Sequence, residues 1–383
     1  MSINKKYQRG FSLIELMIGI TLGLLILAAL SAVLVNNIQS RNDIERANQQ
    51  AENGRYAAQV ISDDLRLAGY LAELDPFSLP TPAAKPDPCA TDLATLTTAL
   101  PLAVQGYNNA SSATLSCLSD VVTGSDILVV RRASTCAVGT VGCDAEITVN
   151  PPPYLQASSC SGSAELSSIT VGGADFFRLN TNTSATTLDR HRKDCNPVAG
   201  VAGSIAPYQQ YLVHIYFVAN NDKPGDGIPT LKRADLTGGP SASVTCSPSG
   251  TPPCFSIVPL VQGIETMQFE YGIDTGAALA TPAPTGTPGA FTPAVDSYSS
   301  CTSTSTPTCT AYWRNVVSAR ISLIARSTSK ATGYDDSKKT YSLGLRANGT
   351  ANTFTPPAND GYKRHVFQSI VRLNNVSGRN TPS

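Results

Sequence analysis

An apolar stretch near the amino terminus constrains this chain more than any other feature. Residues 11–35 read FSLIELMIGITLGLLILAALSAVLV and contain one charged side chain, Glu15. As a helix this stretch spans about 37 Å, which is enough to cross a bilayer with some tilt. Lys5, Lys6 and Arg9 precede it, and cations on that side favour a cytoplasmic amino end. The sequence therefore predicts a single membrane helix, with the residues that follow it outside the cytoplasm.

Gly10 and Glu15 distinguish this segment from an ordinary signal peptide. A secretory signal has a shorter apolar region followed by a small-residue cleavage site, whereas here the small residue precedes the apolar stretch. A plain membrane anchor leaves Glu15 unexplained, because a carboxylate in a lipid-facing helix is costly and marks a functional site. Gly19 and Gly23 form a GxxxG pair, which either permits close helix contact or has no role.

Residues 10–18, GFSLIELMI, resemble the class III signal of type IV prepilins and type II secretion pseudopilins. The resemblance implies that the prepilin peptidase cuts after Gly10 and that the new terminal residue, Phe11, is N-methylated. It also implies that Glu15 pairs with the terminal amine of a neighbouring subunit. Elementary electrostatics agrees, because a carboxylate in an apolar filament core needs a cation, and cleavage creates one.

The helix is expected to continue through residues 36–70, which contain no proline. Small and apolar side chains recur there at three- and four-residue steps, which places them on one helical stripe. Gly69 then ends the helix, and five prolines between residues 76 and 88 prevent its resumption. We expect the stripe to pack against a sheet, and a dimeric coiled coil is the alternative. The stripe consists of Ile44, Ala47, Ala51, Gly54, Ala58, Ile61, Leu65 and Ala68.

All ten cysteines lie beyond residue 88, past the apolar stretch. An even number on one side of a membrane segment predicts disulfides formed in an oxidising compartment. Neighbour pairing is the simplest connectivity, although the sequence leaves the pairing open. A metal cluster is disfavoured, since the chain has no CxxC motif and only three histidines. The candidate disulfide residues are Cys89, Cys117, Cys136, Cys143, Cys160, Cys195, Cys246, Cys254, Cys301 and Cys309.

Residues 71–383 are predicted to form a β-rich head, because turn residues repeatedly interrupt short apolar runs. Within one run, Ile264 and Thr266 are expected on one side and Met267 and Phe269 on the other, with one side buried. The fold class is therefore α+β: a long amino-terminal helix, membrane-spanning in its first half, packed on a mainly antiparallel sheet with long disulfide-bearing loops. Whether the head has one subdomain or two stays open. The candidate strands are residues 126–132, 176–179, 211–219, 257–273 and 316–327.

Three segments resemble a narrower family, the PilW-type minor pilins. They are ISDDLRLAGY at residues 61–70, GIETMQFEYG at residues 263–272 and RHVFQSIVRLNN at residues 364–375. The resemblance covers the first 70 residues well and the last 130 in patches, whereas residues 75–205 and 275–312 match no family that we can name. It implies three kinds of partner: the prepilin peptidase, other minor and major pilins, and the inner-membrane assembly platform.

The search for catalytic and metal-binding patterns yields little. Among the common signatures, GxSxG, HExxH, GxGxxG and the Walker loop are absent from the sequence. His214 lies in an apolar run and is interpreted as a core residue, and the adjacent Asp63 and Asp64 as a solvated helix face. Asp222 and Asp226 are weak calcium candidates, but their segment is more simply a hairpin turn. No cofactor is expected, and zero net charge with 15% charged residues gives no basic surface for nucleic acid.

The sequence therefore favours a minor pilin that incorporates into a type IV pilus or primes its assembly, at or near the tip. Such a protein would sit in the inner membrane with its head in the periplasm, and then in the pilus fibre at the cell surface. A minor pseudopilin of type II secretion, similar to the J component, is one alternative. A tip adhesin or surface-binding module is another, and an anchored enzyme is disfavoured for want of a catalytic signature.

Overall fold

The computed structural model describes residue 10 and residues 12–160, 165, 176–195, 205–247, 250–276 and 284–379. The chain divides into two compact units, Met1–Gln49 and Gln50–Ser383. Helix α1 (Leu13–Leu67) has residues in both units, and we describe each unit by itself.

In the first unit, α1 is an apolar helix with exposed side chains. Every leucine, isoleucine, valine and methionine between Leu13 and Val35 is more than half exposed. The helix is long enough and apolar enough to cross a membrane. An apolar surface of this kind is stable in lipid or in an apolar assembly rather than in water.

In the second unit, the last turns of α1 bury one face. Of the predicted stripe, Gly54, Ile61, Leu65 and Ala68 are buried and Ala58 is half-buried, with Ala57 fully buried beside it, whereas Ile44, Ala47 and Ala51 are exposed. Gly54 lies so close to strand β13 (Arg364–Arg372) that a Cβ atom there would overlap the Phe367 ring. The absence of a side chain at this position therefore sets how closely helix and strand approach.

The larger sheet has seven strands, and all of its pairings are antiparallel. Its order is β1-β2-β5-β3-β4, while β6 also pairs with the long strand β5 and β7 pairs with β6. A 3₁₀ helix η1 (Pro76–Ser78) and the helix α2 (Leu93–Ala99) lie between α1 and the first strand in sequence. The strands are β1 (Val104–Tyr107), β2 (Ile127–Ala133), β3 (Tyr154–Ala157), β4 (Phe177–Asn180), β5 (Tyr208–Ala219), β6 (Thr230–Thr237) and β7 (Cys254–Gln262).

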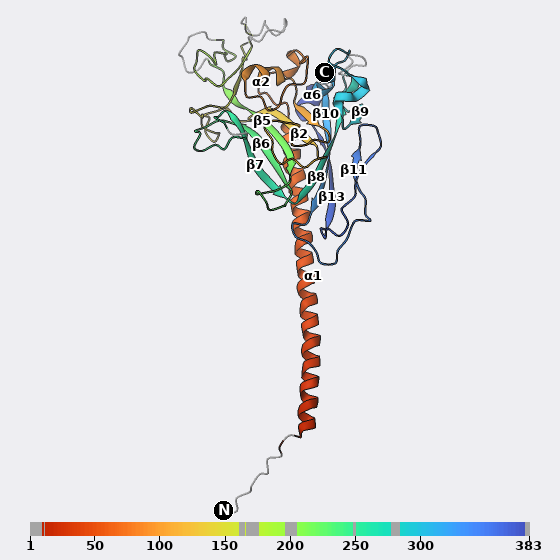
Figure 1. The fold of residues 1–383 in the computed structure, drawn as a ribbon. Coiled ribbons are helices and arrows are strands. Elements are labelled where there is room, and N and C mark those ends of the chain that lie inside the picture. Colours follow the sequence, from red (N-terminus) through yellow and green to blue (C-terminus); the bar gives the residue numbers. More distant parts are fainter. Residues whose placement is uncertain are drawn as a thin grey trace, which may run out of the picture. The chain divides into compact units, whose positions relative to one another are not determined.

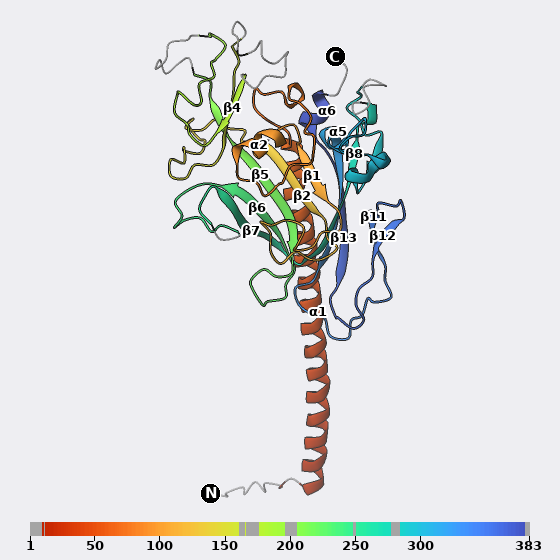
Figure 2. The ribbon, with the colours of Figure 1, turned by 45° about the horizontal axis from the view of Figure 1, so that its top comes forward.

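The second sheet is antiparallel too, with the order β13-β10-β8-β9. A separate two-stranded hairpin, β11–β12, lies beside it, as both ribbon views show (Figures 1 and 2). These strands are β8 (Ile264–Ile273), β9 (Ala290–Thr292), β10 (Val316–Arg326), β11 (Tyr341–Leu345), β12 (Ala351–Phe354) and β13 (Arg364–Arg372). The remaining short helices are η3 (Val295–Ser300), α5 (Cys309–Arg314) and α6 (Asn374–Arg379).

Side chains of the seven-stranded sheet enter two separate hydrophobic cores. Leu128 and Val130 of β2 join the core that contains Ile61 and Leu65 of α1 and the apolar face of the second sheet. The alternate residues of β2, together with those of β5, join a second core beneath α2 and the loops before β2. The sheet is therefore covered on both faces, and together with the antiparallel pairings this confirms the predicted α+β class.

Strand β8 differs from the prediction in two respects. Ile264 is fully buried in the same core as Met267 and Phe269, although alternation predicted the opposite side. The reason is a β-bulge: Ile324 pairs with Thr266 but the next residue, Ala325, pairs with Ile264, which shifts the side-chain register. The polar face of β8 is buried as well, so the prediction of a single buried face was wrong.

All ten cysteines form disulfides in the structure, and these lie mainly in loops. Each disulfide joins one cysteine to the next cysteine along the chain. Because a crosslink restricts the unfolded chain, these disulfides stabilise a head with long irregular loops. The pairs are Cys89–Cys117, Cys136–Cys143, Cys160–Cys195, Cys246–Cys254 and Cys301–Cys309.

Candidate functional site

The first candidate site is the amino-terminal end of α1. Gly10 is exposed and precedes the helix, which begins at Leu13, whereas Phe11 lies outside the described residues. The backbone amide of Ser12 donates to Oε2 of Glu15 at 3.2 Å, so the carboxylate satisfies one of the free amides of the first helical turn. Within the described part of the chain, Glu15 has no cationic partner.

Gly19 and Gly23 lie one turn apart on the same exposed helix. A Cβ atom at either position would meet nothing within 4 Å, so space within this chain does not require glycine there.

The second cluster lies where α1 meets the large sheet, and it corrects an interpretation made from sequence. Asp64 is 6% exposed rather than solvated, whereas its neighbour Asp63 is exposed and pairs with Arg66. The Oδ1 atom of Asp64 accepts from Nε of Arg132 at 2.7 Å. Its Oδ2 atom lies 2.7 Å from Nδ1 of His214 and accepts from the Tyr216 hydroxyl at 2.9 Å.

Electrostatics in this cluster favours the ionised form of Asp64. Burial alone would raise its pKa, but the hydrogen bond and charge of His214, followed by those of Arg132, hold the pKa well below the usual range. His214 is thereby fixed as a buried partner of the helix, and it has no nucleophile among its described contacts. This cluster holds α1 against strands β2 and β5, so its role is structural. We call it the Asp64 tie.

A third buried cluster surrounds Arg364 on β13. The Arg364 side chain is 0% exposed and donates to both oxygens of Glu265, at 2.5 and 2.8 Å. It also pairs with Asp336 at 3.0 Å and with Asp360. One guanidinium therefore holds three carboxylates and fixes the segment between β10 and β13 onto the second sheet.

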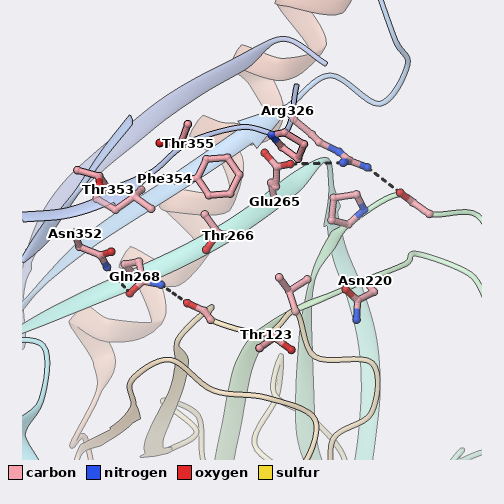
Figure 3. A pocket seen from close by; sticks show the side chains of 16 residues that line it. Thr123, Asn220, Glu265, Thr266, Gln268, Arg326, Asn352, Thr353, Phe354 and Thr355 are labelled. Atoms are coloured by element: carbon pink, nitrogen blue, oxygen red, sulfur yellow. Dashed lines mark hydrogen bonds and ion pairs between the residues drawn. The ribbon is translucent and has the colours of Figure 1, made fainter. Parts of the chain in front are cut away.

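Next to this cluster lies a pocket of about 570 Å³. Its floor is the polar face of β8, with Thr266 and Gln268, and one wall is the β11–β12 hairpin (Figure 3). The opposite wall comes from the loop before β2 and from the β5–β6 turn. The lining residues are Val122, Thr123, Gly124, Asn220, Gly227, Pro229, Glu265, Thr266, Gln268, Arg326, Leu343, Asn352, Thr353, Phe354, Thr355 and Pro357.

Hydrogen bonds fix the side chains at both ends of the pocket. At one end, Nδ2 of Asn352 donates to Oε1 of Gln268 at 3.0 Å, and Nε2 of Gln268 donates to the Gly124 carbonyl at 2.7 Å. At the other end, Arg326 donates to the Gly227 carbonyl at 2.8 Å and lies 3.6 Å from Glu265 (Figure 3). No sequence pattern pointed to this site, because its residues come from segments up to 235 positions apart.

The calcium candidates have other roles in the structure. Asp226 accepts three backbone amides, from Asp222, Lys223 and Ile228, so it closes the β5–β6 turn. The Asp222 carboxylate accepts from the side chain of Gln262 at 3.0 Å. Among the described residues, no group of three or more His, Cys, Asp or Glu side chains is placed to hold a metal ion.

Asp126 connects the two sheets and is 2% exposed. Its oxygens accept from the backbone amides of Asn109 and Phe269, at 2.9 and 2.8 Å. Burial raises the pKa of Asp126 to about 7, since these two hydrogen bonds offset the desolvation only in part. Tyr271 also faces this carboxylate, whose charge adds to the effect of burial in raising the pKa of the phenol.

We expect the contribution of Asp126 to the free energy of unfolding to fall as the pH rises from about 4 to about 7. In that window the unfolded chain has released the proton that the folded protein still holds, so unfolding becomes more favourable. The urea midpoint of the full-length chain at pH 5 and pH 8 measures this. Asp126→Asn should reduce the difference between the two midpoints, whereas Asp63→Asn, on the exposed helix face, should not. An unchanged difference in Asp126→Asn would contradict the assignment.

Two family models match this chain, one near its amino terminus and one in its carboxy-terminal half. The family model of the prokaryotic N-terminal methylation motif matches residues 5–31, which include Gly10 and Glu15. The family model PilW, described as type IV pilus-assembly protein W, matches residues 215–375, which include β8, β10 and β13. No curated protein and no solved structure matches the chain.

The two family matches confirm the resemblances of residues 10–18, 263–272 and 364–375, whereas neither match covers residues 61–70. Pilin-family domains are structural proteins, and membership implies interaction with other pilus components. The motif and the apolar helix also fit membrane anchoring. The two matches therefore support a type IV pilus-related minor pilin, with an amino-terminal methylation motif at residues 5–31 and a region similar to the PilW family at residues 215–375.

Proposed function

We propose that this protein is processed as a prepilin and enters a type IV pilus as a minor subunit that primes assembly. Residues 1–10 are the leader, and residues 11–35 are the membrane and assembly helix. Residues 36–70 extend that helix into the head, which comprises residues 71–383. The prepilin peptidase cuts between Gly10 and Phe11, and Phe11 is then methylated.

The observation that carries the proposal is a single carboxylate in an otherwise apolar, exposed helix. Glu15 has no cationic partner within the described residues, although a carboxylate in an apolar environment requires one. Processing of a neighbouring pilin creates a terminal amine on that subunit, as cleavage after Gly10 does at Phe11 of this chain. We propose that this amine supplies the missing cation, and that it does so only when helices of several pilins are packed together.

The size of the head supports a position at or near the tip of the filament. The unit Gln50–Ser383 carries long loops beyond its two sheets. Successive subunits of a filament must stack closely along the helices, and added bulk is tolerated best where no further subunit packs above. Other minor and major pilins and the inner-membrane assembly platform are therefore the proposed partners, with the head in the periplasm before assembly.

The first test is the mature amino terminus, measured by mass spectrometry of protein from the native membrane or pilus fraction. We expect a chain that begins at N-methylated Phe11. In Gly10→Ala we expect the full-length precursor to accumulate, and in Glu15→Gln we expect normal processing but a severe loss of surface pili, counted by electron microscopy. Thr21→Val is the matched control, because the Thr21 hydroxyl bonds only to its own helix.

An intact Met1, or cleavage beyond residue 35, would overturn the prepilin pathway. Normal pilus numbers in a deletion strain that no longer secretes exoproteins would instead assign the chain to type II secretion as a pseudopilin. Unaltered pili in Glu15→Gln would show that the carboxylate has no role in assembly.

A further inference from the structure

The proposed assembly role makes no use of the pocket between β8 and the β11–β12 hairpin. Its volume of about 570 Å³ lies in the range of small-molecule binding sites. All of its lining residues belong to the head, far in sequence from Glu15. We propose that this pocket binds a short neutral saccharide.

The charged groups of the pocket are already neutralised. Both oxygens of Glu265 accept from Arg364, and Arg326 lies 3.6 Å from the same carboxylate. Arg326 also donates to the Gly227 carbonyl. An anion would have to compete with Glu265 for Arg326, and a cation would have to compete with two guanidinium groups. The pocket therefore selects against charged ligands of either sign.

Its remaining polar groups are hydroxyls and amides. The hydroxyls of four threonines make no hydrogen bond in the part of the chain that the structure describes: Thr123, Thr266, Thr353 and Thr355. Each hydroxyl can both donate and accept, which matches the hydroxyl groups of a sugar ring. A ligand of this kind satisfies the pocket without bringing in charge.

Two amide side chains are fixed in advance. Asn352 donates through Nδ2 to Gln268, and Asn220 donates through Nδ2 to the Asp120 carbonyl at 3.0 Å. In both residues the Oδ1 atom is left to accept a ligand hydroxyl. Because these orientations exist before binding, little side-chain entropy is lost when a ligand is held.

Phe354 supplies the apolar surface that a sugar ring needs. Its ring lines the pocket beside Thr266, at the end of β12 (Figure 3). The C–H face of a pyranose packs on an aromatic ring while its hydroxyls point outward toward polar partners. An aromatic surface, fixed amides and unpartnered hydroxyls, without free charge, together point to a neutral saccharide.

The test uses the full-length chain purified in a zwitterionic detergent, since maltoside and glucoside detergents carry competing sugars. The protein is applied to an array of neutral mono- to tetrasaccharides, with sialylated and sulfated saccharides beside them. The best-bound saccharide is then titrated by calorimetry. Because no step requires a filament, the result does not depend on the proposed assembly function.

Phe354→Ala should weaken binding at least about tenfold, which corresponds to about 1.4 kcal/mol. Thr266→Val, which keeps the side-chain shape, should weaken it about fivefold. Leu345→Ala is the matched control, because Leu345 lies on the same hairpin, is exposed and does not line the pocket; its affinity should stay within twofold. The unfolding midpoints of all three variants are measured alongside.

Four results would overturn the proposal. They are no array signal above background, binding of sialylated or sulfated saccharides alone, and equal affinity in Phe354→Ala and Leu345→Ala. The fourth is efficient crosslinking of a photoreactive residue at position 353 to another pilin in cells, which would make the pocket a subunit contact.

Discussion

Replacing Asp64 by alanine is expected to lower the free energy of unfolding of the head by about 3–5 kcal/mol. The substitution leaves Arg132, His214 and Tyr216 without their shared acceptor in a place from which water is largely excluded. Asp63→Ala is the matched control: Asp63 is the preceding residue, but its ion pair with Arg66 is solvent-exposed, and we expect a loss below about 1 kcal/mol.

Urea unfolding of the full-length chain, with its disulfides intact, measures both variants. The fluorescence of Trp313 reports on the head, because this is the only tryptophan and its side chain is buried. Equal losses in Asp63→Ala and Asp64→Ala would contradict the assignment of the tie between helix and sheet.

The Asp64 tie should also give the head a characteristic sensitivity to acid. The folded pKa of Asp64 lies below the ordinary value of 3.8, so its stabilisation is fully present above that pH. It is lost progressively as the pH falls below 3.8, when the folded carboxylate must take up the proton that the unfolded chain already holds. Asp64→Ala removes this contribution, and its stability should therefore fall less steeply in acid than that of the unmodified protein.

The second large effect is expected at Arg364. Arg364→Met keeps much of the apolar stem but leaves Glu265, Asp336 and Asp360 facing one another without their shared cation. We expect a loss of about 3–5 kcal/mol in the free energy of unfolding, because buried charges whose partner is removed stay uncompensated. The same Trp313 fluorescence experiment measures it.

Arg372→Met provides the comparison for Arg364→Met. Arg372 lies at the other end of the same strand, is exposed and donates to the neutral hydroxyl of Ser377 at 2.7 Å. Arg372→Met should lower the free energy of unfolding by less than about 1 kcal/mol. If the two variants were equally stable, the three carboxylates around Arg364 would have to be satisfied in another way.

Local sequence patterns were sufficient to predict the main elements of the fold. The apolar stripe and the lack of proline predicted a long helix. In the structure this helix ends at Leu67, and Gly69 follows with a positive φ of 73°. Alternation gave β8 and β10, but not the position of Ile264, because a β-bulge depends on how two strands pair and leaves no mark on one strand alone.

The candidate sites could not be predicted in the same way, because they depend on contacts between residues that are far apart in the sequence. Asp64 resembled Asp63 in sequence, and only the return of the chain to His214, 150 residues later, buries one and leaves the other in solvent. The pocket requires five separate regions of the chain to meet, and its threonines are indistinguishable from the many threonines of the loops. By contrast, Gly10, Phe11 and Glu15 lie in one continuous segment, within the residues 5–31 that a family model matches.

Each disulfide of the head joins a cysteine to the next one along the chain. If the head is exported in sequence order, as the proposed function implies, each pair can form before the following cysteine reaches the oxidising side. An oxidase that links the two thiols exported most recently would then produce the native set directly. We therefore expect maturation of this head to require thiol oxidation in the order of export, and not disulfide exchange.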